Sequence, residues 1–332
     1  MANHAKPIQD RLIRQYLVEA ELPKSTHTVA KAALNRWAIF LAAQDQQVSL
    51  LDATRPDFVE WKSLLKATKA SGKDELLSPV TINSYLNRVR AFYRWAEEVE
   101  LLEGKNPTLT VRGLKVTGES EDQPVMSDEI FRTLVATAKQ NRSKHNARRD
   151  VAILTVLWET GLRRIEICNL DLDQYRPAGQ AAHLVVGSAR RTTKSKKVRY
   201  PVLTRVAVRA IEAYLSQRGE DAGPLFLSTS SVDGRMNPMA ITQMVERVRV
   251  RAGLDDRQGI HSLRRAYAIN AKREGVSDGA LKAQCGWEDQ RMIGRYTKSA
   301  EVELAHAEIL AKLDKKPLKP VRPMPQRYRK AS

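Results

Sequence analysis

Residues 150–169 read DVAILTVLWETGLRRIEICN, and this stretch decides the fold of the second half of the chain. Its first eleven residues are strongly apolar, which predicts a buried helix over 150–160. Gly161 follows at the position where helices commonly end in a left-handed residue, and residues 163–169 predict a second, short helix. On that short helix Arg163 and Glu166 are three residues apart and share one face.

The pair Arg163 and Glu166 has two readings. An arginine at the start of a helix can bind a phosphate through two hydrogen bonds from its guanidinium group. An acidic residue one turn later can fix the orientation of that group. The plainer alternative is a surface ion pair, which contributes only a few tenths of a kcal/mol.

A second motif is His261-Ser-Leu-Arg264, followed by Arg265. The spacing of three places the imidazole and the guanidinium on one side of a helix. This pattern offers a phosphate clamp beside a group that exchanges protons near neutral pH. The alternative is a solvated basic helix face.

A third motif is Gly286-Trp287, with Tyr296 nine residues later in the sequence Arg-Tyr-Thr-Lys. A free phenol has a pKa near 10, so a tyrosine nucleophile needs a base and cationic surroundings. The alternative is a pair of aromatic core residues.

A fourth feature is a strongly basic turn between two predicted strands, over 183–187 and 198–203. A lysine at such a turn can reach a neighbouring groove and donate a proton, although most basic turns are simply solvated. The basic residues of the turn are Arg190, Arg191, Lys194, Lys196 and Lys197.

The first third of the chain predicts a small helical domain. Apolar residues recur at helical spacing from Ser25, a candidate N-cap, to about residue 46, and a shorter helix covers 57–67. The clearest helix opens at Ser78-Pro79 and stops before residue 106. The acidic stretch 117–124 has no periodicity and predicts a linker, after which Ser127 caps a new helix. Further helices are expected to about residue 313.

The charge of the chain favours a polyanionic partner. Lys and Arg total 56 against 38 acidic residues, a net charge of +18 with a pI near 10.0. Cationic side chains that neutralise phosphates release counterions, which drives nucleic-acid binding. No apolar run is long enough for a membrane span and no secretory signal is present, so a cytoplasmic, nucleoid-associated protein is expected. Cys168 and Cys285 are expected to be small buried thiols.

Taken in chain order, the four motifs resemble the signature of the tyrosine recombinase (phage integrase) family. They match it as Gly-Leu-Arg-x-x-Glu, a hairpin lysine, His-x-x-Arg, and Gly-Trp with a tyrosine nine residues on. The resemblance covers the whole second domain. It implies a mostly α fold with a small antiparallel β-sheet in the C-terminal domain. It also implies a helical, SAM-like core-binding domain over 1–116, a linker over 117–124, a catalytic domain over 125–314 and a basic, proline-bearing tail over 315–332.

The resemblance implies a role for each catalytic residue. Arg163 and Arg264 would bracket the scissile phosphate of a DNA strand. Tyr296 would attack it, giving a 3′-phosphotyrosine and a free 5′-hydroxyl. Lys194 would protonate the leaving oxygen, with Lys196 and Lys197 as close competitors for that role.

The remaining site residues would assist this reaction. His261 would help to move the tyrosine proton, and Trp287, where many relatives have histidine, would donate one hydrogen bond to the phosphate. Glu166 would orient the cations. Arg265 stands where histidine is common in the family, and either an extra phosphate contact or a surface position is open for it. No metal ion, ATP or other cofactor is expected.

The resemblance also implies partners. The two domains would clamp double-stranded DNA at specific recombination sites, with Arg88, Arg90 and Arg94 as candidate phosphate contacts beside the basic turn. A helix over 299–313 would dock on a neighbouring protomer to form a tetramer on two duplexes. Accessory DNA-bending proteins, the target site and the choice among integration, excision, resolution and transposition are left open. An extra arm-binding domain is not expected, because only a short segment precedes the first strong helix.

Two rival functions remain open. One is a DNA-binding protein that has the fold without the reaction, and the other is an enzyme with the same chemistry, such as a type IB topoisomerase or a hairpin telomere resolvase. A covalent protein–DNA adduct distinguishes the first, and relaxation of supercoils by a monomer distinguishes the topoisomerase.

Overall fold

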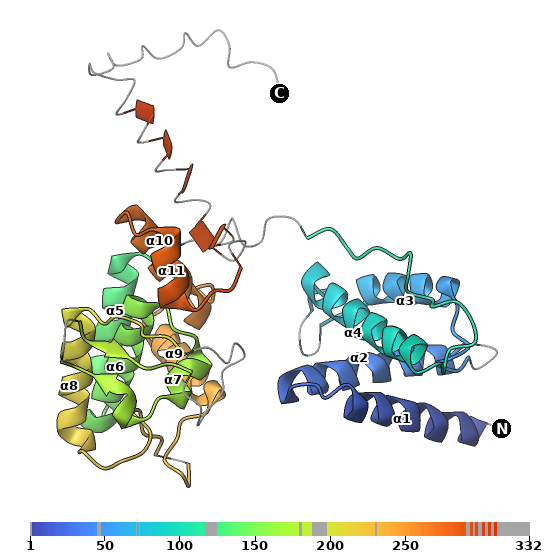
Figure 1. Ribbon diagram of the computed structural model, residues 1–332, viewed down its shortest axis with the longest axis horizontal. Coiled ribbons are helices and arrows are strands. Elements are labelled where there is room, and N and C mark those ends of the chain that lie inside the picture. The colour runs from blue at the N-terminus through green and yellow to red at the C-terminus, as the bar shows by residue number, and fades with distance from the viewer. Residues whose placement is uncertain are drawn as a thin grey trace. The chain divides into compact units, whose positions relative to one another are not determined.

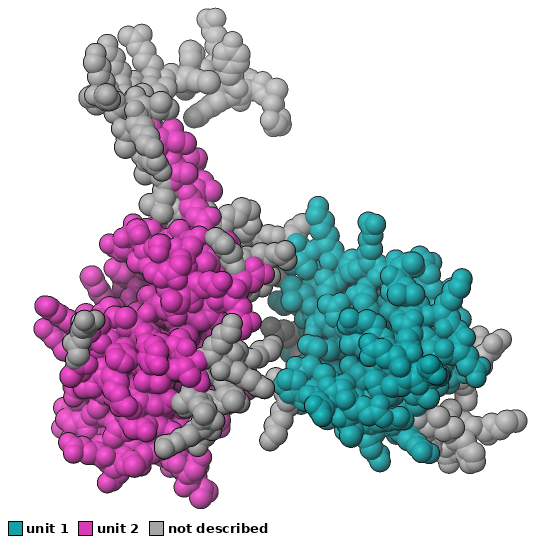
Figure 2. Space-filling model, viewed as in Figure 1, with its two compact units in different colours: residues 1–117 teal, residues 118–332 magenta. Residues whose placement is uncertain are grey.

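The structure is a computed structural model. It describes residues 2–44, 48–70, 72, 74–116, 125–178, 181–187, 198–229, 231–289, 293–294, 296–297, 301–302, 305–306 and 309–310. The chain divides into two compact units, Met1–Thr117 and Gly118–Ser332 (Figure 2). The boundary falls at the start of the expected linker, whose own residues 117–124 lie outside the described part of the chain.

The described residues of the first unit form a bundle of four helices, drawn in Figure 1. They are α1 (Ala2–Glu19), α2 (Lys24–Ala42), α3 (Arg55–Ala67) and α4 (Pro79–Glu98). The core holds a buried hydrogen-bond chain in which Trp37 Nε1 donates to the Tyr93 hydroxyl at 2.9 Å. The same hydroxyl donates to the carbonyl oxygen of Leu50 at 2.7 Å. Both polar groups of these large aromatic residues are therefore satisfied inside an apolar core.

Helix α4 begins as the sequence predicts, since Ser78 accepts a hydrogen bond from the Thr81 amide and Pro79 opens the first turn. One other prediction for this unit was wrong, and one helix was missed. Helix α2 begins at Lys24 with Pro23 at its N-cap, so Ser25 lies inside the helix and does not cap it. Helix α1 was not predicted, although its buried Ile13, Tyr16 and Leu17 have helical spacing.

The second unit is built around one central helix, α6 (Lys144–Thr160), which packs against α5 (Asp128–Lys139), α8 (Arg205–Arg218) and α10 (Ile260–Arg273) (Figure 1). Most side chains of α6 are buried, as the apolar run predicts. The unit also contains α7 (Arg164–Asn169), α9 (Pro238–Arg251) and α11 (Asp278–Cys285). Within the described residues, no helix combines the length and apolar character that a membrane span requires.

The sheet of the second unit is small and antiparallel, as expected, but its make-up differs in part. Strand β1 (Tyr175–Arg176) pairs with β2 (His183–Leu184), and the first of these strands was not predicted. The predicted strand over 198–203 lies along residues 182–186, joined by backbone hydrogen bonds such as Val186 to Arg199 in both directions. The basic turn between them, with all five of its arginines and lysines, lies outside the described residues.

Cys168 and Cys285 are free and buried, as the sequence predicts. Burial raises the pKa of the Cys168 thiol to about 12 and that of Cys285 to about 11. Both thiols are therefore protonated at neutral pH, and neither is a nucleophile.

Gly161 ends α6 in the left-handed conformation with φ +61°, as the sequence predicts. The space around it is also closed, since a Cβ atom there would lie 2.6 Å from Cδ1 of Tyr267 and 3.2 Å from the sulfur of Cys285. Glycine is required at this position for both its backbone angle and its lack of a side chain.

We expect Gly161→Ala to destabilise the second unit more than Gly253→Ala does. Gly253 follows α9 with φ +66°, and a Cβ atom there would meet nothing within 4 Å. The Gly253→Ala variant therefore measures the backbone strain alone, which costs about 1–2 kcal/mol. The clash at Gly161 adds about 1–3 kcal/mol. Urea unfolding of the two full-length variants measures the difference. An equal loss in both would show that the contact with Tyr267 relaxes without cost.

Candidate active site

The carboxylate of Glu166 lies at the centre of a cluster of arginines in the second unit. Its side chain is only 2% exposed. One carboxylate oxygen accepts the backbone N–H of Arg163 at 2.7 Å and Nη2 of Arg199 at 2.6 Å, while the other accepts Nη1 of Arg163 at 3.1 Å. The surface ion pair considered for Arg163 and Glu166 is therefore excluded, because the acid is buried and shared by two arginines.

Arg163 is the N-cap residue of α7, so its side chain is directed by the first turn of that helix. The Arg163 side chain is 39% exposed, whereas Arg264 on α10 is 6% exposed. Burial lowers the pKa of Arg264, and the charge of Arg163 acts in the same direction. A guanidinium remains charged at neutral pH despite such a shift, so both arginines present positive charge.

Both arginines also contact the C-terminal end of α11. Arg163 Nη2 donates to the carbonyl oxygen of Gly286 at 3.1 Å, and Arg264 Nη2 donates to that of Cys285 at 2.9 Å. Arg264 Nη1 donates to the carbonyl oxygen of Gly161, at the end of α6. The last carbonyls of a helix have no partners within it and carry its negative partial charge, so arginines satisfy them well.

Trp287 and Tyr296 form a stacked pair. Their ring centroids are 5.5 Å apart with an interplanar angle of 12°, and the Trp287 side chain is nearly buried. The guanidinium of Arg264 lies over the indole, 5.1 Å from the ring centroid. The indole N–H has no hydrogen-bond partner among the described residues. Trp287 therefore connects the tyrosine to the arginine and keeps one donor unused.

The phenol of Tyr296 lies within electrostatic reach of two arginines. Burial lowers the pKa of Arg264 and of Arg265, and the negative charge of a Tyr296 phenolate would oppose the shift in both. Arg265 is 8% exposed, so the surface position considered for it is wrong. The tyrosine thus lies beside the cationic cluster of its own chain.

His261 lies in the first turn of α10, on the exposed side of the same helix that carries Arg264. Partial burial lowers the pKa of the His261 imidazole, and the charges of Arg164 and Arg264 add to this effect. The imidazole is therefore mostly neutral at pH 7 and can accept a proton.

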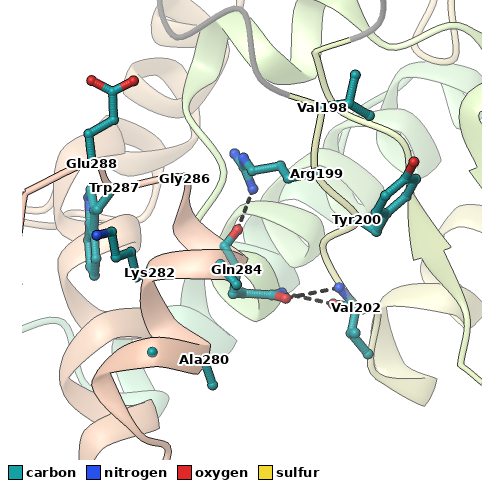
Figure 3. A pocket seen from close by; sticks show the side chains of 12 residues that line it. Val198, Arg199, Tyr200, Val202, Ala280, Lys282, Gln284, Gly286, Trp287 and Glu288 are labelled. Atoms are coloured by element: carbon teal, nitrogen blue, oxygen red, sulfur yellow. Dashed lines mark hydrogen bonds between the residues drawn. The ribbon is translucent and has the colours of Figure 1, made fainter.

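An open groove of about 750 Å³ adjoins the cluster, between the segment 198–202 and α11 (Figure 3). The side-chain amide of Gln284 bridges the two walls, donating to the carbonyl oxygen of Val202 and accepting from its N–H, both at 2.9 Å. Figure 3 also shows Arg199 reaching from the same segment to the backbone carbonyl of Gln284.

Sequence reasoning missed Arg199. Val198, Tyr200 and Val202 are 49%, 62% and 49% exposed, while Leu203 is buried, so the segment alternates outward and inward residues. Arg199 falls on the inward side of this alternation. A charged residue on the inward face of a predicted strand needs a buried partner, and this pattern could have identified Arg199 from the sequence. Lys194, Arg190, Arg191, Lys196 and Lys197, which were predicted, lie outside the described residues.

The predicted arginines of the first unit differ in their surroundings. Arg94 is exposed and Arg88 is half-buried on α4. Arg90 instead donates to the side chain of Asn87 at 2.7 Å and to the carbonyl oxygen of Val111, and it lies over the ring of Phe58. Its guanidinium is therefore engaged within the unit.

No group of His, Cys, Asp or Glu side chains in the described part of the chain is arranged to hold a metal ion. The donors that the site does contain are guanidinium groups, an imidazole, an indole and a phenol. This combination suits an anionic substrate, because it offers several cations and one nucleophilic oxygen.

The fold is that of the tyrosine-type site-specific recombinases. The chain is similar to the XerH site-specific recombinase bound to palindromic difH substrate, with a TM-score of 0.67 at 15% identity over 86% of this chain and 80% of that one. It is also similar to the Tn1549 transposon integrase in complex with transposon right end DNA, with a TM-score of 0.68 at 16% identity over 90% and 98%.

The chain belongs to the phage integrase family, whose model matches residues 125–303. Two curated relatives are similar over most of their length. The tyrosine recombinase XerD of Caulobacter vibrioides is 29% identical over 241 residues, 69% of this chain and 74% of that protein. The tyrosine recombinase XerC of Alcanivorax borkumensis is 27% identical over 243 residues, 72% and 74%. The protein is thus an enzyme of the tyrosine recombinase type.

Proposed function

We propose that this enzyme cuts and rejoins double-stranded DNA at specific sites through a 3′-phosphotyrosine intermediate and a Holliday junction. The observation that carries the proposal is the convergence of Arg163, Arg264, Trp287 and Tyr296 from three separate parts of the sequence into one cluster. Such a cluster places a nucleophilic oxygen beside cations that can neutralise a phosphate.

In the proposed reaction the Tyr296 oxygen attacks the phosphorus and the bond to the 5′-oxygen breaks. Arg163 and Arg264 neutralise the non-bridging oxygens, and the free indole N–H of Trp287 donates one further hydrogen bond. Lys194 supplies the proton that the 5′-oxygen takes as it leaves. The phosphotyrosine ester keeps the energy of the phosphodiester, so the 5′-hydroxyl of another strand can reverse the step without ATP.

His261 takes up the proton that Tyr296 loses. Its exposed position on α10 and its neutral state at pH 7 suit this role. Glu166 holds Arg163, and Arg265, which is buried near the phenol, contributes positive charge to the site.

Double-stranded DNA is the proposed substrate and partner. The net charge of +18 favours it, and two structural neighbours were solved with DNA. In the first unit, the exposed Arg94 and the half-buried Arg88 are the better candidates for phosphate contacts, because Arg90 already has intramolecular partners. The basic turn at 190–197 would add contacts from the second unit.

The active form on DNA is proposed to be a tetramer held together by the predicted helix over 299–313. Its described residues are helical, and Val302, Ile309 and Leu310 are 49%, 50% and 54% exposed at helical spacing. Exposed apolar residues on one helix face favour burial against another molecule, here a second copy of this chain.

The central test is Tyr296→Phe, which removes the nucleophilic oxygen and leaves the ring stacked on Trp287. We expect the variant to bind DNA as the parent does and to lose covalent complex formation by a factor of at least ~10⁴. Sequencing the DNA that the parent traps covalently would supply the target site, and nicked DNA carrying that site would then measure the variant. Covalent linkage by Tyr296→Phe would disprove the assignment of the nucleophile.

We expect a pH dependence from His261. Its pKa lies below the ordinary value of 6.5, so the imidazole is neutral and active above that pKa, and the cleavage rate should fall as pH drops through it. His261→Ala should lower the rate at neutral pH by roughly 10²–10⁴ and abolish this acidic limb. Single-turnover cleavage between pH 5 and 8 measures both. An unchanged limb in His261→Ala would assign it to another group.

Assembly on DNA should depend on the exposed apolar face of residues 302–310. We expect Ile309→Lys with Leu310→Lys to leave DNA binding by the monomer intact and to prevent the four-protein complex, because two charges would have to be buried. Analytical ultracentrifugation of protein with DNA measures the assembly. Val250→Lys, at a residue 60% exposed on α9, is the matched control. Normal tetramers from the double variant would rule out this face.

A further inference from the structure

Three arginines bind three successive carbonyl groups at the end of α11. Arg199 donates to the carbonyl oxygen of Gln284, Arg264 to that of Cys285 and Arg163 to that of Gly286. Arg163 and Arg264 belong to the proposed phosphate site, whereas Arg199 comes from the segment that follows the basic turn. One helix end therefore sets the positions of all three guanidinium groups.

Arg199 directs its guanidinium into the protein at this place. Its side chain is 12% exposed, Nη1 binds the carbonyl of Gln284, and Nη2 binds Glu166 at 2.6 Å. Glu166 also binds Arg163, and the carbonyl of Gln284 lies two residues before that of Gly286, which Arg163 binds. The influence of Arg199 on the reaction must therefore act through those groups.

Gly286 makes this approach possible. It has φ +63°, and a Cβ atom there would lie 2.5 Å from Nε of Arg199 and 3.0 Å from its Cδ. The glycine therefore serves both the left-handed turn at the end of α11 and the close passage of the arginine side chain.

The charges explain why a third arginine is needed. Glu166 carries one negative charge and is shared between Arg163 and Arg199. Without Arg199, one oxygen of a nearly buried carboxylate would lose a charged partner, and Arg163 would remain as the arginine hydrogen-bonded to it. Arg163 would then be drawn toward Glu166 and would be less available to a phosphate.

We propose that Arg199 is a positioning residue of the recombinase site, which neutralises Glu166 and secures the end of α11 so that Arg163 and Arg264 face the scissile phosphate. This inference rests on the proposed function. It extends the site to a residue that contacts neither the phosphate nor the nucleophile in the arrangement described.

The test compares Arg199→Met, Glu166→Gln and the double variant with the parent enzyme. We expect Arg199→Met to slow single-turnover covalent complex formation by roughly 10²-fold at saturating protein, because small misplacements of binding groups have effects of that size. DNA affinity should stay near that of the parent. The double variant should react faster than Arg199→Met, since it removes the carboxylate that Arg199 no longer neutralises. Arg199→Lys should recover part of the rate by restoring the charge.

Arg218→Met is the matched structural control. Arg218 is also nearly buried, at 8% exposure, and its guanidinium donates to the carbonyl oxygens of Asp221 and Pro224 away from the cluster. We expect this variant to lose thermal stability and to keep the parent rate at temperatures where it is folded. Thermal unfolding of every variant shows whether a lost rate follows lost stability.

The outcomes separate the inference from the function on which it rests. If the parent forms no covalent complex with DNA, the proposed function and this inference both fail. If the parent reacts and Arg199→Met reacts equally fast, or the double variant shows the product of the two single effects, only the positioning role is overturned. The same holds if Arg218→Met loses as much rate as Arg199→Met.

Discussion

The second unit depends on the burial of one carboxylate, that of Glu166, among arginines. A buried charge is unfavourable unless charged partners and hydrogen bonds compensate for it. Here the compensation comes from the backbone and side chain of Arg163 and from the side chain of Arg199. The carboxylate therefore requires α7 and the segment 198–203 to lie together. It binds Arg163 and Arg199, and its single negative charge does not neutralise all the arginines of the cluster.

Two helix ends complete this arrangement in the same way. Helices α6 and α11 both stop at left-handed glycines, Gly161 and Gly286, and the carbonyl oxygens of both glycines accept hydrogen bonds from site arginines. At each glycine a side chain would collide with a neighbour, Tyr267 in one case and Arg199 in the other. The carbonyl groups that end each helix without a partner in the helix thus fix the positions of the guanidinium groups. The same helix ends therefore determine both the local fold and the placement of positive charge in the site.

The stacked pair of Trp287 and Tyr296 connects this cationic cluster to the proposed nucleophile. The indole contacts both the guanidinium of Arg264 and the phenol ring, and the stacking limits where the tyrosine can move. In this arrangement the aromatic ring holds the phenol in position and the arginines supply positive charge. A family member with tryptophan at this position therefore obtains more contact area with its tyrosine than a smaller side chain would provide.

Local patterns in the sequence determined the helices with strong periodicity and caps, such as α4 and α6. They also predicted the residues that the structure brings together, which are Arg163, Arg264, Trp287 and Tyr296. These features depend on spacing and residue type, which are properties of short segments.

The features that were missed depend on contacts between segments. Helix α1 is held by the packing of Ile13, Tyr16 and Leu17. Arg90 binds the carbonyl oxygen of Val111, and Arg265 is buried. Arg199 was overlooked because its partners, Glu166 and Gln284, are far away in the chain. The sequence alone thus specified which charged groups are present. Only the tertiary structure decided which of them are buried and paired, because the environment of a side chain is set by contacts between distant segments.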